Sequence, residues 1–261
     1  MFSFKRPALA AQFCEALSGN VILDAKSGMF LAAPRGVGKS IFLREDLVPE
    51  VIRRGWLPIY VDLRADRDAD PSLLISDAIK SALTSLDCIP ESVTLTNALE
   101  RLNVLSGKPI VLIIDEAQHA LESSTGINSM FGLKAARDYL NRSDESPKLM
   151  LVFSGSNQEK LAHLLKHDQP FYGASVTPFP LLGIDFINEF TSSVNTYLAD
   201  NNQLSSDAVL EAFKLVGHRP EMLRTILGQV AIDGESKNLR TMLKDKTSEF
   251  HRQVWNISTR E

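Results

Sequence analysis

The chain has 261 residues, of which 44% are hydrophobic and 23% are charged. This composition is typical of a globular protein rather than a disordered one, and the length suffices for one large domain or for a domain with a small appendage. The formal net charge of −4 argues against a protein that coats nucleic acid by bulk electrostatic attraction.

Cysteine usage and hydropathy indicate a cytoplasmic protein. Cys14 and Cys88 lack the spacing of metal ligands, which predicts two free thiols in a reducing compartment. The N-terminal residues do not combine a positive start with a long apolar run, as a secretory signal would. The longest apolar runs are far shorter than the roughly 20 residues that cross a bilayer. We therefore expect no membrane association.

The first two thirds of the chain alternate short apolar runs with longer amphipathic segments. A helix is predicted over residues 6–17, where Gly19-Asn20 stops it. Buried strands are predicted at 28–33, 57–63, 110–114 and 149–153, and helices at 40–54, 71–86, 95–105, 130–141 and 158–166. Strands that alternate with helices of this length predict an α/β fold, with a parallel sheet covered by helices on both faces.

The pattern changes after Phe179-Pro180, because no further strand-like run appears. Helices are predicted at 185–200, 206–216, 221–231 and 238–255, with Ser205 or Ser206 as the N-cap of the second. We therefore expect a three-layer αβα core over residues 1–180 and a small all-helical C-terminal domain over residues 181–261.

A glycine-rich segment follows the first predicted strand and precedes a helix, which is the context of a P-loop. Backbone amides and the positive end of the helix would hold phosphate groups, Lys39 would neutralise the β and γ phosphates, and the Ser40 hydroxyl would bind Mg²⁺. The residues assigned to ATP are Pro34, Arg35, Gly36, Val37, Gly38, Lys39, Ser40 and Ile41. The alternative is a glycine-rich turn that caps a core helix.

Two carboxylates follow the apolar run at 110–114. Ligands of open parallel sheets gather at the carboxyl ends of strands, where Asp115 and Glu116 fall. Asp115 would hold Mg²⁺, mostly through water, and Glu116 would act as the general base that polarises the attacking water. The alternative is a solvated turn, and the P-loop earlier in the chain argues against it.

Polar residues also follow the run at 149–153. Asn157 or Ser156 would sit close to the γ phosphate and could report its presence. The alternative, an N-cap for the helix at 158–166, is compatible with that role.

Five segments, at residues 33–40, 114–118, 153–157, 171–173 and 217–220, together resemble motifs of the AAA+ ATPases. The resemblance is to the branch of archaeal-type and origin-recognition-type ATPases and related bacterial transposition-accessory proteins. It implies a P-loop NTPase core in which the P-loop strand and the Asp-Glu strand both adjoin the sensor strand, followed by a helical lid. Ala33 departs from the glycine that usually opens the loop.

The resemblance also implies arginines that touch the γ phosphate. Arg219, after Gly217-His218, occupies the position of a lid arginine, although Arg224 competes and an exposed arginine beside a helix start is the alternative. Relatives often carry a trans-acting arginine finger after a Tyr-Gly pair, where this chain has Ala174. Arg137 and Arg142 are possible substitutes. The missing finger predicts slow basal hydrolysis, or activation by a partner.

The leading functional hypothesis is an ATP- and Mg²⁺-dependent AAA+ switch or remodeller that acts on a protein or nucleoprotein partner and forms an ATP-dependent homo-oligomer. A nucleotide-dependent binding module with negligible turnover is the second hypothesis. A P-loop kinase is the third, and Glu116 argues against it because an acid that activates water is a liability there. Binding of nucleic acid follows from family analogy alone.

Overall fold

The computed structural model describes residues 3–19, 25–66, 68–88, 94–142, 146–233 and 239. The elements in chain order are α1 (Pro7–Ser18), β1 (Met29–Ala32), α2 (Lys39–Phe42), the π-helical segment η1 (Leu43–Leu47), α3 (Val48–Arg53), β2 (Leu57–Asp62), α4 (Pro71–Thr84), α5 (Leu95–Ser106), β3 (Ile110–Asp115), the 3₁₀ helix η2 (Ala117–Glu122), α6 (Ser124–Leu140), β4 (Leu149–Gly155), α7 (Gln158–His163), β5 (Val176–Pro178), α8 (Ile184–Asn195), the 3₁₀ helix η3 (Asp200–Asn202), α9 (Ser206–Leu215) and α10 (Pro220–Asp233).

The sheet is parallel, with the strand order β2-β3-β4-β1-β5. This arrangement confirms the predicted α/β fold, and β4 lies between β1 and β3 as the resemblance implied. The fifth strand, β5, was not predicted. It has only three residues, none of them buried, and it ends at a proline, so no apolar run marks it. Only the tertiary structure shows that it pairs with β1.

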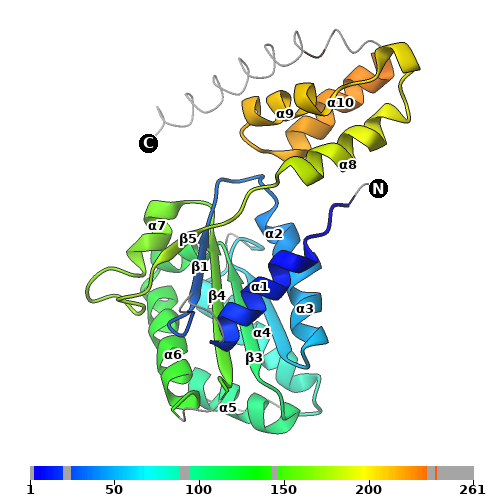
Figure 1. Ribbon diagram of the computed structural model, residues 1–261. Coiled ribbons are helices and arrows are strands. Elements are labelled where there is room, and N and C mark those ends of the chain that lie inside the picture. The colour runs from blue at the N-terminus through cyan, green and yellow to red at the C-terminus, as the bar shows by residue number, and fades with distance from the viewer. Residues whose placement is uncertain are drawn as a thin grey trace. The chain divides into compact units, whose positions relative to one another are not determined.

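Helices cover both faces of this sheet (Figure 1). One core joins α4, α5, α6 and α7 to alternate strand residues, among them Phe30, Leu112 and Phe153. Contacts among α1, η1 and α3 build the layer on the other face. All six residues of β3 are buried, and its one polar side chain is Asp115, at the carboxyl end.

The helix predicted over residues 40–54 is divided by a π-helical segment. Pro49 has no backbone N–H, so the Glu45 carbonyl cannot receive the α-helical hydrogen bond from that position. The Val48 N–H donates instead to the Leu43 carbonyl, one residue further back, and Lys5 donates to the Glu45 carbonyl at 3.3 Å. The three segments still run without a break from Lys39 to Arg53.

Other differences from the predicted elements lie at their ends. The helix expected from residue 130 already begins at Ser124, where Ser123 accepts a hydrogen bond from the Gly126 N–H. The first turns of that helix are mostly polar, so no apolar periodicity marks them in the sequence. The 3₁₀ helix η2 was also not predicted. The helix expected over 185–200 ends at Asn195. The helix expected over 238–255 lies outside the described residues, apart from residue 239.

Contacts divide the chain into two units. The larger comprises residues 5–34 and 39–179, and the smaller comprises residues 1–4, 35–38 and 180–261. The smaller unit packs α8, α9 and α10 around its own apolar core, which includes Ile187, Phe213 and Leu227. Ser205 caps α9, as one of the two predicted candidates, by accepting a hydrogen bond from the Ala208 N–H at 3.2 Å.

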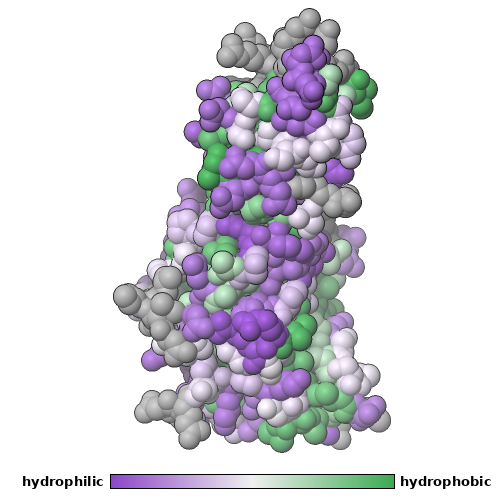
Figure 2. Space-filling view, turned by 45° about the vertical axis from the view of Figure 1, so that its right-hand side comes forward, coloured by the Kyte–Doolittle hydropathy of each residue, from purple (hydrophilic) through white to green (hydrophobic). Residues whose placement is uncertain are grey.

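The surface is mixed. Figure 2 shows a face on which hydrophilic residues predominate and hydrophobic residues form separate areas. No helix among the described residues is long and apolar enough to cross a membrane. Cys14 and Cys88 are both buried, and neither forms a disulfide.

Candidate nucleotide site

The segment between β1 and α2 has the backbone shape that a phosphate-binding loop requires. Gly36 and Gly38 have φ angles of 81° and 95°, which other residues adopt only with strain. The Val37 side chain between them is buried. Lys39 is only 5% exposed, and its Nζ donates to the Ala33 carbonyl at 2.8 Å. The lysine head group is therefore held at the start of the loop, while Ser40 and Ile41 continue the helix.

Asp115, at the end of β3, is completely buried and accepts three hydrogen bonds. The Tyr60 hydroxyl of β2 donates to its Oδ2 at 2.9 Å, and the Glu116 N–H donates to its Oδ1 at 3.0 Å. The Ser154 hydroxyl of β4 also donates to Oδ1. Burial and the Asp115 charge raise the pKa of Tyr60 well above its ordinary value. The two neighbouring strands thus hold this carboxylate from either side.

Neither Tyr60 nor Ser154 was predicted from the sequence to contact Asp115. Both are polar residues within strands that are otherwise mostly apolar, and this was the available signal. The strand register brings both hydroxyls to Asp115, because Asp62 pairs with Asp115 and Ile114 pairs with Phe153. Neither pairing can be read from the sequence.

Glu116 has a left-handed backbone conformation, with φ at 54°, and is 8% exposed. Its Oε2 accepts hydrogen bonds from the Ser156 hydroxyl at 2.6 Å, from the Ser156 N–H at 3.3 Å and from Gln118 Nε2. Burial by itself would raise the pKa of Glu116, but the Ser156 and Gln118 hydrogen bonds and the Lys39 charge outweigh it and lower that pKa. The proposed base is therefore charged and engaged through one oxygen.

Ser156, rather than Asn157, meets Glu116. Asn157 is exposed and caps α7, where its Oδ1 accepts a hydrogen bond from the Lys160 N–H at 2.9 Å. The N-cap alternative that the sequence allowed for Asn157 is therefore realised, and the Glu116 contact belongs to its neighbour.

Gly155 completes the polar end of β4 by having no side chain. A Cβ at this position would lie 2.6 Å from Gln118 Oε1 and 3.3 Å from Leu161. Gln118 can reach Glu116 and Ser156 because this space stays open. Three consecutive residues, Ser154, Gly155 and Ser156, thus support the carboxylates that follow β3.

Arg219 lies in the smaller unit, directly before α10. His218, which precedes it, has a positive φ of 56°, and Arg219 Nη1 lies 3.9 Å from Met222 Sδ. Within the same unit, the Arg219 side chain lies 3.6 Å from the position that a Cβ on Gly36 would take. Arg224, the competing candidate, is exposed on α10.

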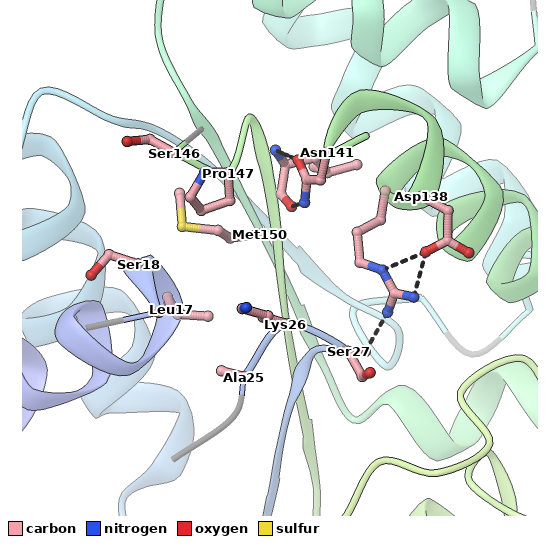
Figure 3. Close-up of a pocket in the computed structure, with 13 residues that line it drawn as sticks. Leu17, Ser18, Ala25, Lys26, Ser27, Asp138, Asn141, Ser146, Pro147 and Met150 are labelled. Carbon is pink, nitrogen blue, oxygen red and sulfur yellow. Dashed lines mark hydrogen bonds and ion pairs between the residues drawn. The ribbon is translucent and has the colours of Figure 1, made fainter. Parts of the chain in front are cut away.

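Arg137 does not suit the role of a finger that reaches a neighbouring subunit. It is 9% exposed, its Nη1 donates to the Ser27 carbonyl at 2.5 Å, and its Nε and Nη2 donate to Asp138 at 3.0 and 2.6 Å. Asp138 and Ser27 line a cavity of about 640 Å³ beside the amino ends of β1 and β4 (Figure 3). Arg142 is exposed and lies 4.8 Å from the Tyr139 ring centre.

Asp115, at the end of β3, and Ser40, in α2, are residue types that bind divalent cations through oxygen. Asp115 offers carboxylate oxygens and Ser40 offers a hydroxyl, which are ligands that Mg²⁺ prefers. The three groups that donate hydrogen bonds to Asp115 are all neutral, so they orient its negative charge without cancelling it. These residues therefore fit a magnesium ion.

Comparison of the structure with solved structures decides the fold class. The Walker-type ATPase PABY2304 of Pyrococcus abyssi superimposes with a TM-score of 0.65 at 18% identity, over 98% of this chain and 76% of that chain. The chain has the fold of the AAA+ P-loop ATPases. No protein-family model and no curated protein sequence matches it.

Two further AAA+ structures are similar. The Aeropyrum pernix ORC1 protein, solved in complex with DNA, gives a TM-score of 0.54 at 14% identity over 91% of this chain. AMPPCP-bound DnaA from Aquifex aeolicus gives 0.53 at 14% identity over 94% of this chain. The chain spans only 64% of the ORC1 chain and 68% of the DnaA chain. The AAA+ resemblance of the sequence is thus confirmed at the level of the fold.

Proposed function

We propose that the chain is an ATP-binding and ATP-hydrolysing AAA+ switch or remodeller that acts on a protein or nucleoprotein partner. The observation that carries the proposal is the pair of carboxylates at the end of β3. Asp115 is held between β2 and β4, and Glu116 is held by Ser156 and influenced by the Lys39 charge. A carboxylate pair supported in this way, close to the lysine of a glycine-rich loop, suits phosphate hydrolysis.

The nucleotide would be held mainly by the loop after β1. Its backbone amides and the N-terminus of the helix that begins at Lys39 would bind the phosphates, and Lys39 would exchange the Ala33 carbonyl for a phosphate oxygen. Ser40 and Asp115 would hold Mg²⁺. The ion would supply charge neutralisation on the terminal phosphates.

Glu116 would accept the proton of the attacking water. Three hydrogen bonds to its Oε2 orient the carboxylate, but they also weaken it as a base by stabilising its charged form. Hydrolysis would therefore be slow until one of these bonds is released. Ser156 is the residue through which a γ phosphate could act on Glu116, while Asn157 would remain at the start of α7.

The remaining roles rest on the resemblance. Arg219 would contact the γ phosphate, and its position beside Gly36 within the smaller unit favours it over Arg224. An arginine of a second subunit would complete the site in an ATP-dependent homo-oligomer, with Arg142 as an exposed candidate. The boundary near residue 180, the cytoplasmic location and any contact with nucleic acid belong to the same proposal.

A binding module with negligible turnover is the second candidate. Two observations favour it: the hydrogen bonds that engage Glu116, and Ala174 at the position where relatives often carry a finger arginine. Such a protein would still exchange nucleotide and change its affinity for a partner, but it would release little phosphate.

Phosphate release from ATP with Mg²⁺ and no acceptor separates these functions. The wild-type chain should release phosphate slowly, and Glu116→Gln should reduce the rate by roughly a hundredfold or more, as expected for loss of a general base. Binding of a fluorescent ATP analogue should persist in Glu116→Gln and be lost in Lys39→Ala. An unchanged release rate in Glu116→Gln would remove Glu116 from the mechanism. Binding without release would favour the binding module.

A further inference from the structure

A second cavity, of about 320 Å³, lies against Gln118, the residue that donates to Glu116. Its walls come from η2, from the first turn of α6, from α7 and from the segment that follows α7. All of these elements belong to the larger unit. The cavity is therefore separated from the candidate catalytic base by a single side chain.

The cavity walls combine apolar side chains with polar and charged ones. Leu121 and Ile127 are half-buried and line it from η2 and α6. Lys160 and His163, one turn apart on α7, are exposed at its edge. Glu122 also lines the cavity, but its carboxylate lies 2.9 Å from His119 Nδ1. Leu121 and Ile127 thus suit an aliphatic side chain, and Lys160 suits a carboxylate beside it.

Two residues that line this cavity each carry a buried acceptor without a hydrogen-bond partner among the described residues. These acceptors are Oε1 of Gln118 and Oε1 of Gln169. A buried polar atom without a partner costs free energy, so a nearby N–H donor would be favoured. Peptide backbones carry such donors at regular intervals.

Only the nitrogen of the Gln118 amide has hydrogen-bond partners among the described residues. Its Nε2 serves Glu116 and Ser156, while its Oε1 lies against Gly155 without a donor. If the amide turned toward the cavity, Oε1 could accept an N–H from an occupant, and Nε2 would leave Glu116 Oε2. Occupancy of the cavity and release of the candidate base would then be the same event.

We propose that the cavity binds a short segment of a partner protein, with an aliphatic residue beside an acidic one, and that binding draws Gln118 away from Glu116 and accelerates hydrolysis. The aliphatic side chain packs against Leu121 and Ile127, the acidic one pairs with Lys160, and backbone N–H groups satisfy Gln118. The acceleration rests on the proposed ATPase function. The binding of the segment does not.

A random dodecamer peptide library displayed on phage tests the binding step. The library is selected on the full wild-type chain and depleted on the Lys160→Glu variant. Enriched sequences are synthesised with a fluorescein label, and their affinity is measured by anisotropy. The matched control is Lys166→Glu, a reversal at another exposed lysine of the same region that does not line the cavity.

We expect the enriched peptides to share an acidic residue next to Leu, Ile or Val. Lys160→Glu should weaken their binding about fivefold or more, whereas Lys166→Glu should leave it within twofold. A bound peptide should raise the phosphate release rate of the wild type several-fold. The same peptide should still bind Gln118→Ala, but it should not change the phosphate release rate of that variant.

Three results would overturn the proposal: no enrichment, peptides that bind Lys160→Glu as well as the wild type, or bound peptides that leave wild-type hydrolysis unchanged. Self-association of the chain that a peptide displaces would identify a second copy as the occupant and refute a foreign partner. If the wild type releases no phosphate under any condition, the ATPase proposal fails, while anisotropy still decides whether the cavity binds the segment.

Discussion

Replacing Tyr60 with phenylalanine removes one hydroxyl and leaves the ring in place. That hydroxyl donates to Asp115 Oδ2 at 2.9 Å, and Asp115 is completely buried. A hydrogen bond to a charged group contributes about 1.5–3 kcal/mol to stability, and water cannot easily replace the donor at a buried oxygen. We therefore expect Tyr60→Phe to lower the free energy of unfolding by about 2 kcal/mol.

The same substitution should weaken Mg²⁺ binding, because it frees the carboxylate to rotate. Loss of a group that orients a metal ligand reduces metal affinity by roughly tenfold or more. The assay is the Mg²⁺ concentration that gives half of the fluorescence change of a bound ATP analogue, alongside binding of that analogue in EDTA. The Mg²⁺ midpoint should rise in Tyr60→Phe, while binding in EDTA should stay the same.

Tyr139→Phe is the matched control. Its hydroxyl also donates to a carboxylate, that of Glu100 at 3.1 Å, but this bond is exposed to solvent. The control should change the free energy of unfolding by less than about 0.5 kcal/mol and leave the Mg²⁺ midpoint unchanged. Equal effects of the two substitutions, or an unchanged midpoint in Tyr60→Phe, would refute the assigned role of Tyr60.

Substitutions at Ser156, Gly155 and Arg137 give three further predictions. The hydrogen bonds that lower the pKa of Glu116 stabilise the fold at pH values above the ordinary carboxyl pKa, and this contribution disappears as the pH falls through the lowered pKa. Ser156→Ala removes one of these bonds and should raise the pKa of Glu116. Acid unfolding and the acid limb of the pH profile of hydrolysis should therefore both move to higher pH. Gly155→Ala should lower the free energy of unfolding, measured in urea, by about 1–3 kcal/mol, because the added Cβ would meet Gln118 and Leu161. Gly228→Ala in α10 is the control. An added Cβ there meets nothing within 4 Å, so this substitution should raise the free energy of unfolding slightly. Arg137→Ala should destabilise the fold by about 1–2 kcal/mol and leave hydrolysis by a folded assembly unaffected; a selective loss of hydrolysis would instead support a finger role.

Much of the larger unit was predictable because its signals are local. The buried strands β1 to β4 appear in the sequence as apolar runs between helical segments, and glycine, serine and threonine mark several helix ends. The elements that were missed lack such signals. β5 has three residues without an apolar run, and the π-helical segment η1 depends on a missing N–H at Pro49 that the predicted helix ignored.

The sequence by itself determined the class of fold and the segments that carry the candidate site. Periodicity requires the α/β arrangement, and the loop at 34–40 and the Asp115-Glu116 pair identify themselves by residue type and by the strands before them. Tertiary structure alone decided which polar groups meet. Tyr60 and Ser154 reach Asp115 only through strand register, and Ser156 rather than Asn157 reaches Glu116 only through the way β4 ends. These contacts join residues about forty or more positions apart, and a one-residue shift in register would turn each side chain to the opposite face of the sheet.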